Sequence, residues 1–339
     1  MKDLLALPVE TDGPFLVGYR KLSHTYTPKG QTTPRTILVH VWYPATEKND
    51  ASPIYGPLID LDAYTDAPAM TPVRAEGFPV LVYSHGSNSF GGSAKFLLHR
   101  FVSNGWVYIA PDHTGNLLLD STADKDRPIA MYYERSLDVS EALSFVKADA
   151  TLGPRIASDR VVMAGHSYGG FTSWATAGAK FDAAAVKKQC DAMIFQAPCT
   201  QAEVDAFAAG VRDPRVIAAI PMAGGNGSTD WFGQTGQDSV EVPLLIMSGT
   251  EDPASAEEAF SRVSGVDLSW IHIDGACHQT FSLGGCKNIP DAESFAIVNA
   301  YSLAFARKHL LSDTSARTVG LTDGSMSASP RVTFKHKAK

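Results

Sequence analysis

The sequence predicts an α/β fold, in which a mostly parallel sheet is covered by helices on both faces. The first observation is a series of short apolar runs, which are typical of buried strands. These runs lie at residues 79–83, 106–110, 216–220, 242–247 and 268–273. The second observation is the segments with helical character between them, such as residues 131–148. Strands that alternate with helices pair in parallel, and 339 residues are enough for one large domain. We expect that domain at residues 1–311 and a C-terminal tail at 312–339.

The first part of the predicted domain is a pair of strands. Residues 14–25 and 36–43 read as strands, the second of them rich in β-branched and aromatic side chains, and a turn around residues 28–30 separates them. Together they predict a hairpin-like pair. Residues 46–77 are rich in Pro, Asp and Ala and show weak periodicity. We expect them to form a long excursion that borders the functional site.

Predicted helices follow most of the buried runs. They cover residues 92–104, 131–148, 256–263 and 292–311. Residues 179–213 predict a mostly helical insertion within the domain. A polar loop at residues 113–128 and a glycine-rich loop at 221–227 each follow a predicted strand. The residues after 311 are rich in Ser, Thr and Lys with few large apolar side chains, which predicts a tail of undefined order.

Composition argues against several classes of function. The net charge of −7 disfavours nucleic acid as a partner, because the phosphate backbone attracts basic surfaces. No apolar run approaches the roughly 20 residues that span a bilayer, so we expect no membrane insertion. The chain does not begin with a basic region followed by a long apolar one. An exported protein would therefore be a mature form from which the leader has been removed.

A nucleophile elbow is the central motif of the chain. Residues 165–169 read Gly-His-Ser-Tyr-Gly, after a short apolar run and before a segment with helical character. This is the strand–turn–helix context in which a strained turn lifts a serine hydroxyl above the edge of the sheet. Gly165 and Gly169 lack a Cβ atom, which lets the backbone pass close by. Ser167 is therefore the candidate nucleophile, and the alternative is an ordinary Gly/Ser turn.

A serine hydroxyl is a weak nucleophile, so it needs a base and a group that orients the base. His278 is the candidate base because it lies in a loop directly after the last predicted strand. His272 lies inside that strand and is the weaker alternative. Asp252 is the candidate acid, because it follows a strand end and gives the chain order Ser, Asp, His. The alternatives are a helix N-cap for Asp252 and an ordinary loop histidine for His278.

The tetrahedral intermediate of acyl transfer needs two backbone N–H donors. One belongs to Tyr168, the residue after the candidate nucleophile. The second is expected from the loop after residues 79–83, where Ser87 is the candidate. Trp231 and Phe232 follow the glycine-rich loop. They are candidates for the wall of an acyl or alcohol pocket, and local packing is the alternative.

The four cysteines bear on the cellular compartment. Cys190 and Cys199 are nine positions apart, as are Cys277 and Cys286, and three pairings are open. Two local disulfides would indicate a periplasmic or secreted protein, and four buried thiols a cytoplasmic one. The even number and close pairing favour disulfides. A zinc site is disfavoured because there is no Cys-x-x-Cys motif. A Cys277–Cys286 bridge would stiffen the loop that presents His278.

Six segments carry a resemblance to a known superfamily. They are residues 41–45 (Val-Trp-Tyr-Pro-Ala), 83–86 (Tyr-Ser-His-Gly), 165–170 (Gly-His-Ser-Tyr-Gly-Gly), 213–216 (Asp-Pro-Arg-Val), 249–252 (Gly-Thr-Glu-Asp) and 278–281 (His-Gln-Thr-Phe). Taken in order, they resemble the α/β-hydrolase superfamily, and more closely its branch of platelet-activating-factor acetylhydrolases and bacterial dienelactone-hydrolase-like esterases. The resemblance implies Ser167 as nucleophile, Asp252 as acid and His278 as base. It also implies backbone donors at Ser87 and Tyr168.

The sequence departs from this branch at two points. Dienelactone hydrolases use a cysteine nucleophile where this chain has Ser167, which argues against a lactone substrate. Lipid-active members carry apolar surface helices without a clear equivalent here, which argues against a phospholipid. Secreted polyester hydrolases also resemble the elbow and the C-terminal cysteine pair, so polymer and aryl esters remain alternatives.

These observations predict a serine carboxylesterase that acts on short-acyl or aromatic esters through an acyl-enzyme. We expect a small-molecule ester as the substrate and no metal or organic cofactor. An amidase or peptidase with the same three side chains is the alternative within enzymes. A non-catalytic binding protein of the same fold is the alternative from another class.

Overall fold

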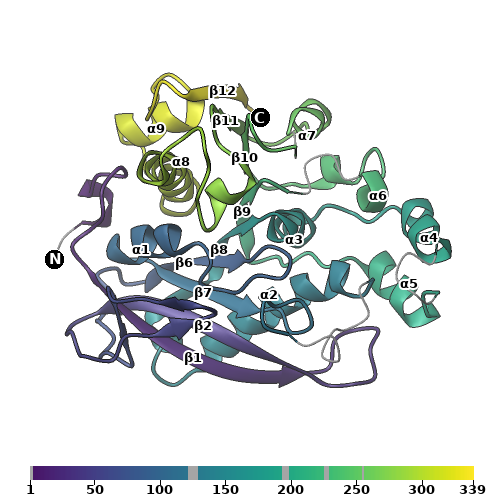
Figure 1. Ribbon diagram of the computed structural model, residues 1–339, viewed down its shortest axis with the longest axis horizontal. Coiled ribbons are helices and arrows are strands. Elements are labelled where there is room, and N and C mark those ends of the chain that lie inside the picture. The colour runs from purple at the N-terminus through teal and green to yellow at the C-terminus, as the bar shows by residue number, and fades with distance from the viewer. Residues whose placement is uncertain (1–2, 121–128, 193–197, 225–228, 254–255) are drawn as a thin grey trace.

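The computed structural model describes residues 3–120, 129–192, 198–224, 229–253 and 256–339. Within these ranges, the main sheet has ten strands in the order β12-β11-β10-β9-β8-β6-β7-β2-β1-β5 (Figure 1). Its strands are β1 (Leu16–Tyr26), β2 (Arg35–Ala45), β5 (Ala63–Thr65), β6 (Phe78–Ser84), β7 (Val107–Asp112), β8 (Ile156–His166), β9 (Val216–Met222), β10 (Leu244–Gly249), β11 (Leu268–Ile273) and β12 (Val332–Lys337). Each of the five apolar runs of the sequence overlaps one of these strands.

The centre of the sheet is parallel, as the alternation of strands and helices predicts. From β7 through β6, β8, β9 and β10 to β11, each strand pairs in parallel with the next one in the sheet. The predicted hairpin is confirmed, because β1 and β2 pair antiparallel over their whole length. The sheet is mixed at its two sides, where β2 pairs antiparallel with β7 and β12 with β11.

Helices pack on both faces of the sheet. They are α1 (Lys95–Ser103), α2 (Met131–Ala148), α3 (Tyr168–Ala177), α4 (Ala183–Asp191), α5 (Gln201–Ala209), α6 (Thr229–Phe232), α7 (Glu257–Arg262), α8 (Asp291–Leu311) and α9 (Ala316–Asp323). Short 3-10 turns form at η1 (Leu4–Ala6), η2 (Gly153–Arg155), η3 (Gln237–Ser239) and η4 (His278–Phe281). Strand β6 shows how the faces divide, because successive side chains of a strand point to opposite sides. Val80 and Val82 join the core formed with α2 and α3, whereas Leu81 and Tyr83 join the core formed with α1 and α8.

The excursion at residues 46–77 contains short strands that its composition did not predict. Strands β3 (Ile54–Tyr55) and β4 (Leu58–Ile59) form a separate two-stranded hairpin. Strand β5 adds to the main sheet in parallel with β1. The expected helical insertion contains α4 and α5, which lie together at one end of the molecule, at the right of Figure 1.

The residues after 311 differ from the expected tail. They form α9 and β12, and β12 pairs antiparallel with β11 over six residues, with Phe334 opposite Ile271. Leu321 of α9 is fully buried. The folded domain therefore extends to residue 337. The Ser, Thr and Lys content hid this strand, because what fixes β12 is pairing with β11 rather than a strongly apolar sequence. None of the helices in the described ranges has the length and apolar character needed to cross a membrane.

Candidate active site

Ser167 occupies a strained turn between β8 and α3. Its φ of 57° and ψ of −115° lie outside the regions that residues with a side chain normally adopt. Glycine makes this turn sterically allowed. A Cβ atom on Gly165 would lie 2.2 Å from the carbonyl oxygen of Gly169, and one on Gly169 would lie 1.8 Å from that of Ser84. The predicted strand–turn–helix geometry is therefore present at Ser167.

The structure brings Ser167, His278 and Asp252 together at the carboxyl ends of β8, β10 and β11. The Nε2 atom of His278 lies 2.8 Å from the Oγ atom of Ser167. The Nδ1 atom of His278 lies 3.2 and 3.1 Å from the two carboxylate oxygens of Asp252. The side chain of Asp252 is fully buried, whereas that of His278 is 37% exposed. The imidazole thus has one nitrogen on a buried acceptor and the other on an accessible hydroxyl.

The alternatives for these residues do not match the contacts. The ring of His272 bonds the hydroxyl of Ser248 at 2.8 Å, away from the elbow. The N-cap of α7 is Ala256 rather than Asp252. The imidazole of His278 and the carboxylate of Asp252 therefore have the geometric relation that a base and its orienting acid require.

His166 has a contact that the sequence did not predict. Its Nε2–H donates to the backbone carbonyl of His278 at 2.9 Å, and the two ring centres are 4.7 Å apart. Burial, helped by the neighbouring His278 ring, lowers the pKa of His166 to about 3, so this imidazole is neutral at physiological pH. His166 does not bond Ser167. It instead fixes the backbone that carries the His278 side chain.

The loop after β6 lies beside the elbow. A Cβ atom on Gly86 would lie 3.4 Å from the Cβ atom of Ser167. Ser87 follows directly, and its hydroxyl accepts a hydrogen bond of 3.2 Å from the amide of Asn116. Tyr168 is the first residue of α3 and supplies the backbone N–H at the other side of Ser167. Of the two predicted backbone donors, Tyr168 thus follows Ser167 directly in the chain, and Ser87 follows Gly86, which lies next to the Ser167 side chain.

A buried arginine lies under this loop. The guanidinium of Arg135 stacks on the ring of Tyr168, with 4.5 Å between its central carbon and the ring centre. Burial lowers the pKa of Arg135 to about 10, so the side chain keeps its charge at neutral pH. Its hydrogen-bond acceptors are Thr172 Oγ1, Asn116 Oδ1, Ser84 Oγ and the carbonyl oxygen of His85. No sequence signal singled out Arg135, because its acceptors come from separate parts of the chain.

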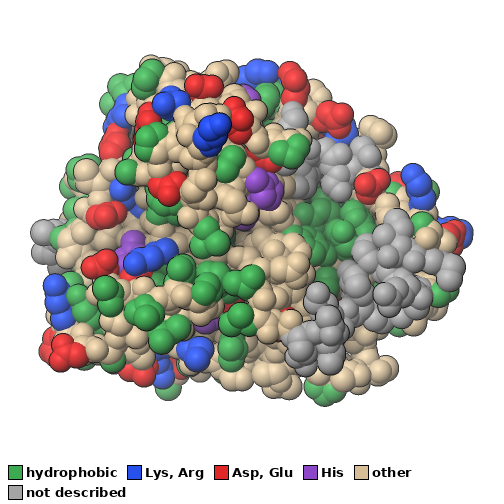
Figure 2. Space-filling model, viewed as in Figure 1, with side chains coloured by type: hydrophobic (Ala, Val, Ile, Leu, Met, Phe, Trp, Pro, Cys, Tyr) green, Lys and Arg blue, Asp and Glu red, His purple; other side chains and the backbone are tan. Residues whose placement is uncertain are grey.

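An aromatic cluster packs near the start of α3. Trp231 is almost fully buried and stacks on Tyr132 with ring centres 3.9 Å apart, and Tyr132 in turn lies 4.9 Å from Tyr168. Figure 2 shows a gathering of hydrophobic side chains on the face where α2, α3 and α6 meet. Phe232 has no exposed surface and stacks on Phe171. A contact between Phe232 and a substrate is therefore excluded in this conformation.

Both cysteine pairs form the local disulfides that their spacing favoured. Cys190 bonds Cys199, and Cys277 bonds Cys286. The second bridge closes the segment that contains η4, and η4 begins at His278. Among the residues that the structure describes, no three His, Cys, Asp or Glu side chains are arranged to hold a metal ion.

Of the comparisons with known proteins, the one with solved structures agrees with this architecture. No protein-family profile matches the sequence, and neither does any curated protein. A solved structure, the ferulic acid esterase from Streptomyces cinnamoneus, is similar over 97% of this chain and 98% of its own, with a TM-score of 0.67 and 21% sequence identity. The similarity shows that the chain has the α/β-hydrolase fold of that esterase.

Proposed function

We propose that this protein is a serine carboxylesterase. The observation that carries the proposal is the 2.8 Å contact between the Nε2 atom of His278 and the hydroxyl of Ser167, in a strained turn at the carboxyl edge of the sheet. A serine with an adjacent imidazole and a carboxylate behind it is the arrangement that makes a hydroxyl nucleophilic. Asp252 is that carboxylate, and its burial keeps water from competing for the imidazole Nδ1–H.

The proposed reaction has two halves. His278 takes the proton of Ser167 while the Oγ atom attacks the ester carbonyl carbon, and the resulting oxyanion accepts hydrogen bonds from the N–H groups of Ser87 and Tyr168. The tetrahedral species then collapses. The C–O bond to the alcohol breaks and the alcohol leaves with the proton from His278. Water, deprotonated by the same imidazole, next attacks the acyl-enzyme. The bond between the acyl carbon and the Ser167 Oγ atom then breaks, Oγ takes the proton back from His278, and the carboxylic acid is released.

The substrate class that we infer is an aromatic or short-acyl ester. The Tyr132, Tyr168 and Trp231 rings lie next to the elbow, and flat apolar side chains favour a planar acyl group. The similar solved structure is a ferulic acid esterase, and ferulic acid is an aromatic acid. We infer that methyl ferulate and short nitrophenyl esters are better substrates than long-chain nitrophenyl esters. The two disulfides support an oxidising compartment, the periplasm or the exterior.

Removal of the nucleophile tests the proposal. In Ser167→Ala, ester turnover should fall by several orders of magnitude, because the remaining groups cannot form the acyl-enzyme. Ser325→Ala is the matched control, because it removes an exposed hydroxyl just after α9, outside the loops that surround Ser167. Its turnover should stay near that of the wild type. The measurement is hydrolysis of nitrophenyl acetate and methyl ferulate.

Covalent labelling separates a catalyst from a binding protein of the same fold. A fluorophosphonate probe should modify the wild-type protein at Ser167 and leave Ser167→Ala unmodified. A wild-type protein that neither reacts with the probe nor hydrolyses an ester would favour the binding protein. Turnover on a matched anilide as fast as on the ester would favour an amidase.

A further inference from the structure

The orientation of one peptide in the loop after β6 is determined by the ring of His85. This side chain has no exposed surface. Its Nδ1 atom lies 2.7 Å from the carbonyl oxygen of Gly86, and its Nε2 atom lies 3.1 Å from the backbone nitrogen of His113. A carbonyl oxygen only accepts and a backbone N–H only donates. The proton of the neutral ring is therefore on Nδ1, and burial lowers the pKa of His85 well below its usual range, which keeps the ring neutral.

The hydrogen bond to Gly86 has a consequence for the next N–H. In a trans peptide the C=O and N–H groups point in opposite directions, and no cis peptide occurs in the described residues. Because the Gly86 carbonyl points at the His85 ring, the N–H of Ser87 points away from it. Gly86 also faces the elbow, since an added Cβ atom would lie 3.4 Å from the Ser167 Cβ atom.

We propose that His85 is a positioning residue, whose Nδ1–H holds the Gly86–Ser87 peptide so that the Ser87 N–H faces the developing oxyanion. This inference rests on the proposed esterase function and names the group that sets its second donor. A rotated peptide would replace a donor with a carbonyl oxygen, whose lone pairs repel the oxyanion. Loss of one such donor reduces kcat by about 10²- to 10³-fold in comparable enzymes.

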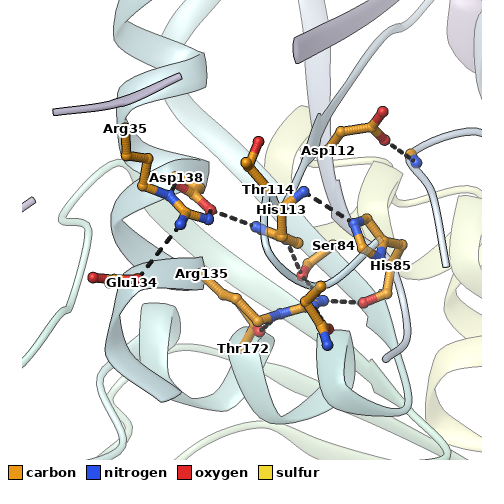
Figure 3. A network of polar contacts seen from close by, with 12 residues as sticks. Arg35, Ser84, His85, Asp112, His113, Thr114, Glu134, Arg135, Asp138 and Thr172 are labelled. Atoms are coloured by element: carbon orange, nitrogen blue, oxygen red, sulfur yellow. Dashed lines mark hydrogen bonds and ion pairs between the residues drawn. The ribbon is translucent and has the colours of Figure 1, made fainter. Parts of the chain in front are cut away.

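A buried network keeps the His85 ring in this state (Figure 3). The Nδ1–H of His113 donates to Asp138 at 2.8 Å, and the hydroxyl of Ser84 donates to His113 Nε2 at 2.8 Å. Arg35 binds both oxygens of Asp138 at 2.8 Å each. These bonds fix the position of His113, and the backbone N–H of His113 sets the tautomer of His85.

Arg135 holds the same loop from the other side. Its guanidinium donates to the carbonyl oxygen of His85 and, at 3.1 Å, to the hydroxyl of Ser84. Its second amino group donates to Asn116 at 2.7 Å, and Asn116 bonds the Ser87 hydroxyl. The peptides on both sides of Gly86 are thus restrained. A buried polar network with satisfied partners is rigid, which suits a preorganised oxyanion site.

Two substitutions at residue 85 separate the effects of the hydrogen bonds made by the two ring nitrogens. In His85→Asn, the side-chain amide nitrogen stands near the place of Nδ1 and donates to the Gly86 carbonyl, but nothing replaces Nε2. In His85→Gln, the longer side chain supplies an acceptor near the place of Nε2 for the His113 N–H, and the donor to Gly86 is lost. Both variants replace the buried ring by an uncharged amide. We expect kcat to fall about tenfold or more in His85→Gln with KM unchanged, and to stay within about threefold of wild type in His85→Asn.

The tautomer provides a readout without substitution. In long-range ¹H–¹⁵N spectra of the imidazoles, assigned with His85→Asn, His85 should appear as the neutral Nδ1–H form at neutral pH. The Nε2–H form or an imidazolium would overturn the inference.

The outcomes also separate this inference from the proposed function. Equal losses of kcat in both variants, or a loss in neither, would overturn the inference while an active wild type keeps the esterase proposal. If His85→Gln does not fold, the result for His85→Asn decides. A folded His85→Asn variant with a tenfold lower kcat contradicts the inference, and one with a kcat near that of the wild type supports it. A wild type without ester turnover and without labelling at Ser167 would overturn both.

Discussion

At the scale of single residues, the two nitrogens of the His278 ring have different partners. An ionised carboxylate only accepts hydrogen bonds, so the buried side chain of Asp252 requires a proton on Nδ1. The Nε2 atom is then left with a lone pair, and this atom lies 2.8 Å from the Ser167 hydroxyl. In the proposed reaction, the carboxylate therefore sets the direction in which the proton moves as well as the position of the ring.

Replacing the carboxylate of residue 252 by an amide tests whether the carboxylate sets the position of the ring proton. In Asp252→Asn the side-chain amide can donate to Nδ1, which puts the ring proton on Nε2. The protonated Nε2 atom then cannot take the proton of Ser167. We expect kcat to fall by roughly 10⁴-fold with little change in KM. The adjacent and exposed Glu251 gives the matched control, because Glu251→Gln removes the same charge away from the ring. Steady-state kinetics on a nitrophenyl ester measure both, and a loss below about tenfold in Asp252→Asn would contradict the role.

Chain order is enough to select the three candidate side chains of the proposed reaction but not the residues that support them. Ser167, Asp252 and His278 each follow a predicted strand, and the carboxyl ends of parallel strands meet at one edge. No sequence pattern assigned a role to His85, which belongs to the Tyr-Ser-His-Gly segment, or to His166, which lies in the elbow motif. Their partners are the carbonyls of Gly86 and His278, and backbone partners leave no pattern in the side chains of a sequence.

At the scale of elements, the two disulfides have different positions relative to the site. Cys277 directly precedes η4, and its bond to Cys286 closes the segment that carries His278. Within this segment the hydroxyl of Thr280 also accepts from the Cys277 backbone N–H at 3.2 Å. The Cys190–Cys199 bond instead belongs to the α4 and α5 region at the end of the molecule.

Removing each bridge should therefore have a different effect. In the double variant Cys277→Ala/Cys286→Ala, we expect kcat to fall clearly, because the base loses a rigid support. In Cys190→Ala/Cys199→Ala, kcat should be unchanged. Each change should lower the free energy of unfolding by about 2–3 kcal/mol, because the closed loops have the same length. Kinetics and urea unfolding measure the two effects. An equal kcat in the two double variants would contradict the role of the bridge at η4.

Elements were predictable where the pattern was local. Residues 131–148 match α2 at both ends, and the second half of the sheet follows from apolar runs. Strands β3, β4 and β5 have only two or three residues each, so no periodicity can reveal them. Strand β12 alternates Val332, Phe334 and His336 with more polar neighbours. Its position is fixed by pairing with β11 and by the hydrogen bond between His336 and Asp267. Such pairing partners are distant in the chain.

At the scale of the whole molecule, several imidazoles are buried in the neutral form. Burial lowers the pKa of His113 and His309 to about 4 and that of His166 to about 3, and it lowers the pKa of His85 in the same direction. In the unfolded chain each of these groups would titrate near about 6.5. Each is therefore neutral in the folded protein and takes up a proton on unfolding in mildly acidic solution.

This difference predicts a steep loss of stability in mild acid. The stabilisation is complete above about pH 6.5 and is lost as the pH falls towards the folded pKa values of about 4 and 3. Between about pH 6 and 5, three to four protons bind on unfolding, so the free energy of unfolding should decrease by about 4–5 kcal/mol per pH unit. Urea unfolding at a series of pH values measures this slope. His309→Gln is the control variant, because His309 is on α8 and its loss should reduce the proton uptake by about one. A slope of about 1 kcal/mol per pH unit or less in the wild type would mean that these imidazoles are not held neutral by the fold.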